Sequence, residues 1–105
     1  MRNDFINEVR KVLEAGLDGG DVSLHGTARK AAMSRRAIQR ELTNQGTNFR
    51  GVLDTVRYRI AVDLLKQKSD AACEIATLLG YSHLSSFHRA FKRWTGKTPR
   101  KFLRS

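Results

Sequence analysis

The stretch "LGYSHLSSFHRAFKRWTG" (residues 79–96) joins a glycine-containing turn to a strongly two-sided helix pattern. At about 100° per residue, Phe87, Phe91 and Trp94 fall on one face of that helix. The opposite face begins with short polar side chains and continues with cations, namely Ser85, Ser86, Arg89, Lys92 and Arg93, and His88 lies to one side. One face is therefore suited to a hydrophobic core, and the other presents polar groups to a partner.

A helix that enters the major groove of DNA needs this distribution. Its base-reading groups lie near the N-terminal half, and its phosphate-binding cations lie where the groove walls pass. A helix, a short turn containing glycine and a second helix form a helix-turn-helix unit. The stretch therefore predicts such a unit with its aromatic side chains in the core. The alternative is that these rings stack on single-stranded bases.

The pattern occurs a second time, in "AAMSRRAIQREL" (31–42), which aligns with "GYSHLSSFHRAF" (80–91). The pairs that match at an offset of 49 are Ile38 with Phe87, Arg40 with Arg89, and Leu42 with Phe91. Upstream, Ala28 matches Ala76 at an offset of 48, so the second turn is one residue longer. Two aligned copies in a chain of 105 residues are much stronger evidence for helix-turn-helix units than one copy.

The composition limits the class of protein. A chain of 105 residues can form one small domain, or two very small ones that share a core. Its single cysteine excludes an internal disulfide and is typical of a reducing compartment. No apolar run reaches the roughly 18 residues that a membrane helix needs, and the N-terminus does not resemble a signal peptide. We therefore expect a soluble, cytoplasmic protein.

The charge is distributed very unevenly. The chain has a net charge of +10, yet residues 1–21 carry five acids and three bases, a net charge of −2. Residues 22–105 carry 17 bases and five acids, a net charge of +12, and no acid follows Glu74. Such a field favours a polyanionic partner, most often nucleic acid. A basic surface that serves only solubility is the alternative.

Apolar residues recur with a period near 3.6 along almost the whole chain, which predicts an all-α fold of about seven helices. We expect two helix-turn-helix units joined by a long linking helix. The predicted organisation is an N-terminal helix with a short Gly-rich connection (1–21), a first unit (22–46), a linking helix (47–68), a second unit (70–96) and a C-terminal helix (98–104).

Particular residues mark the predicted helix ends. Expected N-caps are Asp4, Ser23, Ser34, Thr47 or Asn48, and Thr98, and expected helix ends are "GLDGGD" (16–21), Gly46 and Gly80. The linking helix has an expected apolar stripe of Val52, Val56, Ile60 and Leu64, flanked by Leu53, Ala61 and Leu65. Its 19 residues (48–66) would span about 28 Å, against about 34 Å between successive major grooves on one face of DNA. One chain could therefore read two adjacent grooves as a monomer.

The stretch "EIATLLGYSHLSSFHRAFKRWTGKTPRKF" closely resembles the second helix-turn-helix of the AraC/XylS family of bacterial transcription regulators. The residues that carry this resemblance are Glu74-Ile75-Ala76, Leu79-Gly80-Tyr81-Ser82, Ser86-Phe87, Arg89-Ala90-Phe91-Lys92-Arg93, Gly96 and Pro99. The stretches "MSRRAIQREL" and "GTNFRGVLDTVRYRIAVDLL" resemble the family's first unit and linking helix. The resemblance covers about residues 22–104.

The resemblance implies sequence-specific binding of double-stranded DNA and control of transcription, usually activation through contact with RNA polymerase. By its motifs, the base-reading residues would be Arg36, Gln39 and Arg40 in the first unit and Ser85, Ser86, His88 and Arg89 in the second. The expected phosphate-binding residues are Ser34, Arg35, Thr43, Asn44, Ser82, Lys92, Arg93, Lys97 and Arg100. Each of these sets could instead form a solvated helix face.

The first unit departs from the family pattern. Gly26 lies inside its first helix, at a cost of about 1 kcal/mol relative to alanine. Ala32 stands where the family has glycine, and alanine ends a helix less well in the left-handed conformation. We therefore expect the first unit to be the looser one. The effector-binding or dimerising domain of most members is also missing, so the chain is either a fragment or one of the small single-domain members.

No other chemistry is indicated. His25, His83 and His88 have no metal-ligand spacing with one another or with Cys73, and we expect Cys73 to be a small buried residue. No nucleophile constellation or phosphate-binding glycine loop is present, so no enzyme, metal or cofactor is expected. The remaining alternative function is a basic helical module that binds structured RNA or a protein partner without reading sequence.

Overall fold

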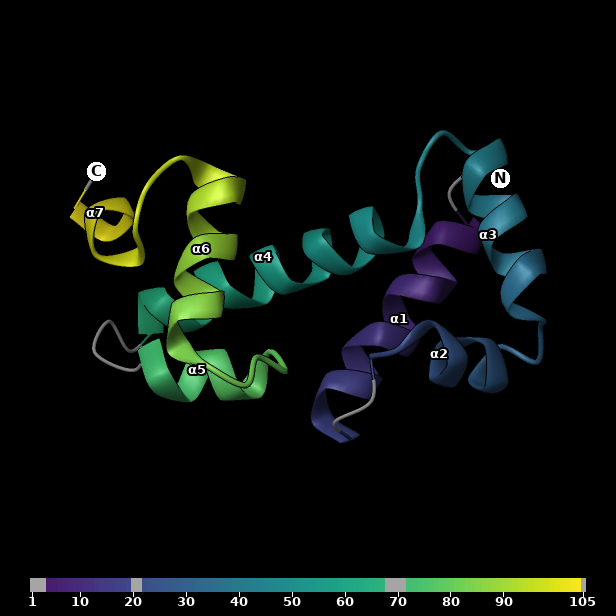
Figure 1. Cartoon of the computed structure of the whole chain (residues 1–105), viewed down its shortest axis with the longest axis horizontal. Coiled ribbons are helices and arrows are strands. Elements are labelled where there is room, and N and C mark those ends of the chain that lie inside the picture. The colour runs from purple at the N-terminus through teal and green to yellow at the C-terminus, as the bar shows by residue number, and fades with distance from the viewer. Residues whose placement is uncertain (1–3, 20–21, 68–71, 105) are drawn as a thin grey trace. The chain divides into compact units, whose positions relative to one another are not determined.

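A computed structural model of the chain describes residues 4–19, 22–67 and 72–104. Within these residues the fold is all-α, as expected, with seven helices and no strand (Figure 1). The helices are α1 (Asp4–Gly19), α2 (Leu24–Lys30), α3 (Arg35–Asn44), α4 (Phe49–Gln67), α5 (Ala72–Leu78), α6 (Leu84–Thr95) and α7 (Pro99–Arg104). The predicted end of the linking helix at 68, the start of the second unit at 70–71 and the connection at 20–21 lie outside the described residues.

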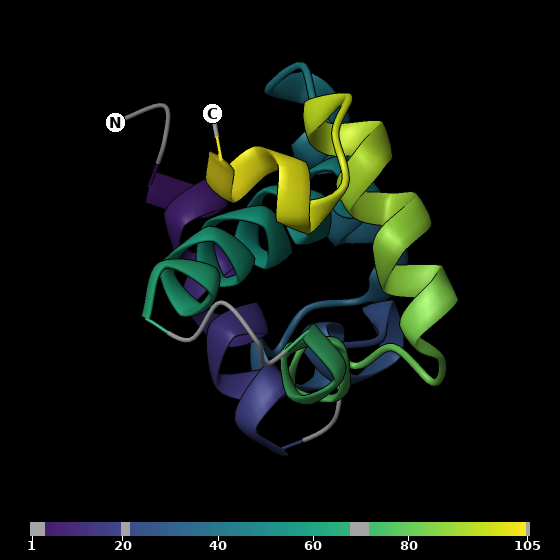
Figure 2. The same cartoon turned by 90° about the vertical axis from the view of Figure 1, so that its left-hand side faces the viewer.

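The chain divides into two compact units, residues 1–56 and residues 57–105, with the boundary inside α4. In the first unit α1 packs on α2, and α2 packs on α3. In the second unit α5 packs on α6, and α7 folds back beside α6 in both views (Figures 1 and 2). No helix of the described residues is long and apolar enough to cross a membrane.

Side-chain caps begin four helices where the sequence predicts them, whereas the expected cap Asp4 is the first residue of α1 itself. Four side-chain oxygens accept a hydrogen bond from the amide three residues further on, at 2.7–3.3 Å: Ser23 from Gly26, Ser34 from Ala37, Asn48 from Gly51, and Thr98 from Lys101. Each bond satisfies an amide that has no partner within its own helix. Asn48, rather than Thr47, is therefore the cap of the linking helix.

Both helix-turn-helix turns have the same backbone geometry. Ala32 and Gly80 adopt positive φ angles of 56° and 90°. The next residue donates its amide to the carbonyl five positions back, Met33 to Ala28 at 3.0 Å and Tyr81 to Ala76 at 2.9 Å. This is the Schellman ending of a helix, which turns the chain sharply. Ala32 therefore takes the left-handed position that the sequence assigned to it.

Each unit has its own apolar core. In the first unit the buried side chains include Val9, Leu13, Ile38 and Leu42, each of them at most 1% exposed. In the second unit they include Ala61, Leu65, Ile75, Ala76, Leu79, Phe87 and Phe91. Phe87 and Phe91 are fully buried, which confirms them as core residues, whereas Trp94 is half-buried. Burial of this inner face is what fixes α3 and α6 with their polar faces outward.

The apolar stripe expected along α4 is confirmed in its first half and wrong in its second. Val52 and Val56 are buried, but further along the helix the buried residues are the expected flanking residues Ala61 and Leu65, while Ile60 and Leu64 of the stripe are only half-buried. From Val52 to Ala61 there are nine residues, about 900° of rotation, so the buried face moves to the opposite side of the helix. Each half of α4 serves the core of a different unit, and a single stripe cannot do that.

The helix α1 ends at Gly19, within the expected end "GLDGGD" (16–21). It passes through the buried Gly16, because glycine weakens a helix without forbidding it. Cys73 is exposed, although it was expected to be buried. Leu78, on the same helix, is 53% exposed. Both Cys73 and Leu78 lie on a seven-residue helix that buries only Ile75 and Ala76, so most of its side chains face outward.

Candidate nucleic-acid interface

The first reading helix, α3, is divided cleanly between core and surface. Ile38 and Leu42 are completely buried, which holds the helix against the first unit. The five polar side chains Arg36, Gln39, Arg40, Thr43 and Asn44 are all exposed and line one shallow hollow of about 590 Å³. The structure thus brings together the three base-reading residues predicted for the first unit and two of the predicted phosphate-binding ones.

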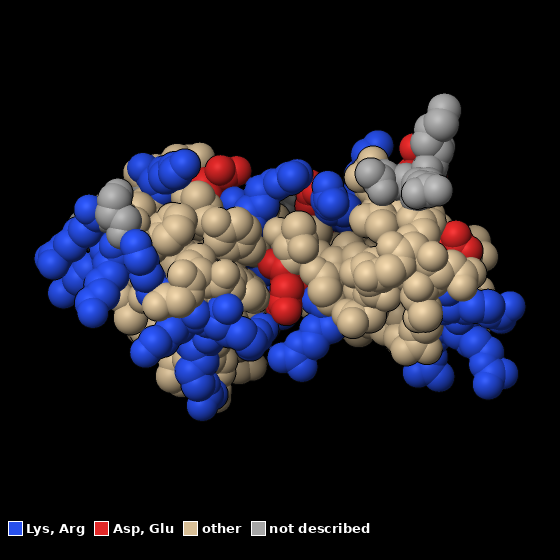
Figure 3. Space-filling view, turned by 90° about the horizontal axis from the view of Figure 1, so that it is seen from above, with Lys and Arg blue, Asp and Glu red and all other residues tan. Residues whose placement is uncertain are grey.

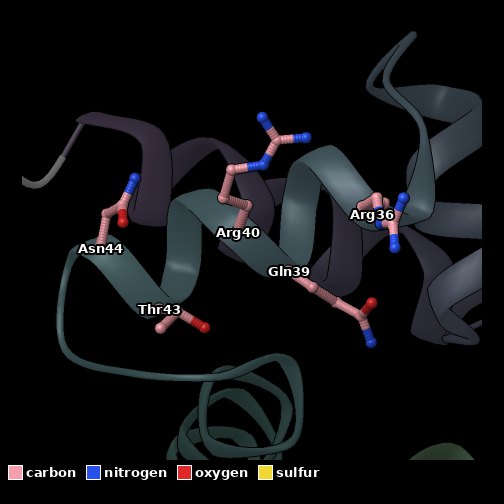
Figure 4. A pocket seen from close by; sticks show the side chains of 5 residues that line it. All are labelled: Arg36, Gln39, Arg40, Thr43 and Asn44. Carbon is pink, nitrogen blue, oxygen red and sulfur yellow. The ribbon is translucent and has the colours of Figure 1, made fainter.

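These side chains leave α3 along two edges. In Figure 4, Arg40 and Asn44 extend toward the upper edge of the helix, whereas Gln39 and Thr43 extend toward the lower edge. The spacing of four residues within each pair explains the arrangement, since such residues share a helix face. Long side chains on one helix can therefore reach both walls and the floor of a groove that receives it.

The start of α3 is built by Ser34 and Arg35. The Ser34 hydroxyl accepts from the Ala37 amide at 3.0 Å, so it is already engaged as the helix cap. Its O–H is still available as a donor, because the cap uses only an acceptor lone pair. Arg35 is exposed next to it. Both predicted phosphate-binding residues lie at the positively polarised end of the helix, where anions are favoured.

A second hollow, of about 680 Å³, lies between α3 and the start of α4. Gln39 and Thr43 line it from α3, and the cap Asn48 and the α4 residue Arg50 line it from the other side. Arg50 is exposed and was not among the predicted site residues. The sequence could have identified Arg50, because it is a cation two residues after the expected cap Asn48 and only six residues after the end of the first reading helix at Asn44.

The second reading helix, α6, exposes three of its four predicted base-reading residues. Ser85, His88 and Arg89 are exposed, and Ser86 is half-buried. His88 lines a hollow of about 690 Å³ whose other walls include Thr98, Arg100 and Leu103 of the C-terminal segment. The structure therefore brings His88 together with Arg100, a predicted phosphate-binding residue.

Cations dominate the end of α6 and the segment beyond it. Lys92, Arg93, Lys97 and Arg100 are all exposed, as is Ser82 at the start of the turn. Lys and Arg side chains gather in several groups on the face that Figure 3 shows, with few acids among them. The left-handed Gly96, with φ of 79°, ends α6 and turns the chain back to α7. Within the described residues, no group of three or more His, Cys, Asp or Glu side chains could hold a metal ion.

Two units with the same turn geometry, each exposing the polar face of its second helix, define the class as a double helix-turn-helix DNA-binding domain. A family model described as a helix-turn-helix domain matches residues 27–105. The chain belongs to the AraC/XylS family of transcription regulators and corresponds to their helix-turn-helix DNA-binding domain.

Similar proteins agree with this assignment. The chain is 38% identical over 99 residues to the ornithine utilization regulator of Pseudomonas aeruginosa, a match that covers 94% of this chain and 29% of that protein. It is 37% identical over 83 residues to the transcriptional regulator VqsM of the same organism, covering 79% of this chain and 26% of the relative. The chain thus spans less than a third of the length of these regulators.

Solved structures give the same fold. The crystal structure of the transcriptional regulator CdpR from Pseudomonas aeruginosa superposes with a TM-score of 0.74 at 38% identity, covering 79% of this chain and 26% of that one. A DNA-binding transcriptional dual regulator from Escherichia coli K-12 gives a TM-score of 0.75 at 22% identity, covering 92% of this chain and 97% of that one. The latter supports the fold alone.

Proposed function

We propose that this chain binds a specific double-stranded DNA site as a monomer, with α3 and α6 in two successive major grooves. The observation that carries the proposal is the repetition within one chain. Each unit has a Schellman turn followed by a helix with a buried apolar face and an exposed polar face. Because both reading helices belong to one chain, a dimer is not needed to contact two grooves.

The proposed roles of the residues follow from their chemistry. Arg36, Gln39 and Arg40 have long side chains that can form paired hydrogen bonds with guanine or adenine edges. Ser85, Ser86, His88 and Arg89 read bases in the second groove, where hydroxyls allow more than one base. The phosphate-binding set is Ser34, Arg35, Thr43, Asn44, Ser82, Lys92, Arg93, Lys97 and Arg100, to which the structure suggests adding Arg50. Binding by this set would be largely independent of sequence.

The proposed biological outcome is activation of transcription in the bacterial cytoplasm through contact with RNA polymerase. One relative, 26% identical over 98 residues, is described as the transcriptional activator NphR of a Rhodococcus species. A reporter promoter that carries the bound site is the direct test. Transcription by purified RNA polymerase should rise when the chain is added, and a fall in transcription would show repression instead.

The DNA-binding proposal is tested by selecting bound duplexes from a random pool and then competing them against random duplex. Specific DNA-binding proteins prefer their site by about 10³-fold or more. We expect an asymmetric selected site with two contacted grooves about one helical turn apart. If the chain binds selected and random duplex with nearly equal affinity, a basic module that binds structured RNA or protein without reading sequence is favoured. A palindromic site bound by two chains would contradict binding as a monomer.

A further inference from the structure

Arg57, on α4, makes two contacts with the turn between α5 and α6. Its Nε–H donates to the Leu79 carbonyl oxygen at a distance of 2.9 Å. Its guanidinium carbon lies 4.5 Å from the centroid of the Tyr81 ring. All three residues belong to the second unit. One half-buried side chain therefore holds the residues on both sides of Gly80.

Both contacts suit the geometry of this turn. Carbonyls at the end of a helix have no partner within that helix, and the Arg57 N–H supplies one to Leu79. The cation over the face of Tyr81 is attracted by the ring, most strongly where water is partly excluded. The planar guanidinium can make both contacts at once, since it carries N–H donors at its edge and stacks by its face.

The contacts continue from the turn into the reading helix. The Tyr81 ring lies 6.0 Å from the Phe87 ring, with an angle of 43° between their planes. Phe87 is completely buried on the inner face of α6 and precedes Arg89 by two residues. Phe87 also contacts Phe91 one turn further along, at 5.8 Å between centroids. A continuous series of contacts thus leads from Arg57 on α4, through Tyr81 in the turn, to the buried face of α6.

We propose that Arg57 is a positioning residue for DNA recognition by the second unit. It fixes the direction in which α6 leaves the turn, and hence the base edges that Ser85 and Arg89 reach, without touching DNA itself. This inference rests on the proposed function. The first unit offers an internal comparison, because Met33 stands at the place of Tyr81 and has no aromatic face for a cation.

The main variant is Arg57→Met, which keeps much of the apolar stem and removes both the donor and the charge. We expect discrimination between right and wrong bases in the second groove to fall about tenfold, the size of one well-placed base contact. Discrimination in the first groove should stay within about twofold of the wild-type value. Tyr81→Leu should give the same pattern. Arg57→Lys should restore the discrimination only in part, because an ammonium keeps the charge and a donor but has no planar group that can donate to Leu79 and stack on Tyr81 at once.

Arg59→Met is the matched control, because Arg59 lies two residues further on the same helix and is exposed. It removes the same charge, and it should weaken all duplexes equally without changing base preference. The inference is overturned if Arg57→Met and Arg59→Met behave alike, or if Arg57→Met lowers discrimination in both grooves to the same degree. The second result would indicate a general loss of structure.

A measurement without DNA separates this inference from the proposed function. In amide hydrogen exchange, Arg57→Met should speed exchange of the Tyr81 and Phe87 amides by about fivefold or more, and leave the Met33 amide unchanged. If the Tyr81 and Phe87 amides of the Arg57→Met variant exchange at the same rate as in the wild-type chain, the inference is overturned. If the wild-type chain shows no base preference at all, the proposed function fails, and the exchange result alone still decides whether Arg57 holds the turn.

Discussion

Ala32 and Gly80 occupy the same place in the two helix-turn-helix units and share a left-handed backbone, with φ angles of 56° and 90°. Each is followed by an amide that closes the turn onto the preceding helix. Glycine adopts this conformation without strain, whereas the Cβ of alanine is crowded in it. The first unit therefore has a strained turn where the second has a relaxed one.

Replacing the strained residue should stabilise the first unit. We expect Ala32→Gly to raise the free energy of unfolding by about 0.5–1 kcal/mol, because relief of the left-handed strain outweighs the added freedom of the unfolded chain. Urea denaturation followed by circular dichroism measures the change. Ala31→Gly is the matched control, since Ala31 has φ of −82° and gains no relief. If Ala32→Gly and Ala31→Gly change the free energy of unfolding equally, the left-handed backbone at Ala32 is not strained.

A second weakness of the first unit is a buried hydroxyl. Thr27 is 1% exposed, and its Oγ1 has no hydrogen-bond partner among the described residues. The corresponding residue in the second unit, 48 positions further on, is the buried Ile75. We expect Thr27→Val to raise the free energy of unfolding by about 1 kcal/mol, because it removes a polar group buried without a partner.

Thr77→Val is the control for this prediction. Thr77 is exposed, and its hydroxyl already donates to the Cys73 carbonyl oxygen at 3.1 Å. Its replacement should change the free energy of unfolding by less than about 0.5 kcal/mol. Thermal denaturation of both variants gives the comparison. A loss of stability in Thr27→Val would mean that its hydroxyl has a partner.

Local signals predicted most of the fold. The caps Ser23 and Ser34, and the glycine at position 80, act within three to five residues of themselves, so the sequence alone locates them. The repeat at offsets of 48 and 49 likewise identified both reading helices and their exposed faces. These features depend on the chain's own periodicity and not on distant contacts.

Features that depend on tertiary packing were missed. The buried face of α4 changes side between Val56 and Ala61 because each half packs in a different unit, and a periodicity search assumes one continuous face. The role of Arg57 depends on a contact with Leu79, 22 residues away. For the interface, exposure of all predicted phosphate-binding residues agrees with their proposed role, but the contacted bases and phosphates stay predictions.

The two reading helices should contribute differently to binding. Arg40→Ala should weaken binding to the selected site by about 1–3 kcal/mol and relax the preference at one or two base pairs, because paired hydrogen bonds to a base are lost. Lys92→Ala should weaken binding to cognate and scrambled duplexes alike and reduce the salt slope by about 1. Titrations of each variant with both duplexes at several salt concentrations test this. If Lys92→Ala changes base preference and Arg40→Ala does not, the assigned roles are reversed.

The total affinity should depend steeply on salt. Residues 22–105 carry 17 bases, and contact with roughly 6–10 phosphates predicts a slope of log K against log[salt] of about −5 to −9. Fluorescence anisotropy between low and moderate salt measures the slope. A slope shallower than about −2 would mean that too few phosphates are contacted for two grooves.

The most direct test of two-groove recognition is the affinity of the wild-type chain for three duplexes. The first carries the selected site, the second has the base pairs of one contacted groove scrambled, and the third has those of the other scrambled. We predict that each scrambled duplex binds at least about tenfold more weakly, since each helix loses at least one specific base contact worth about 1–3 kcal/mol. Equal affinity for all three duplexes would contradict sequence-specific recognition, and a loss with only one of them would show that a single unit reads the DNA.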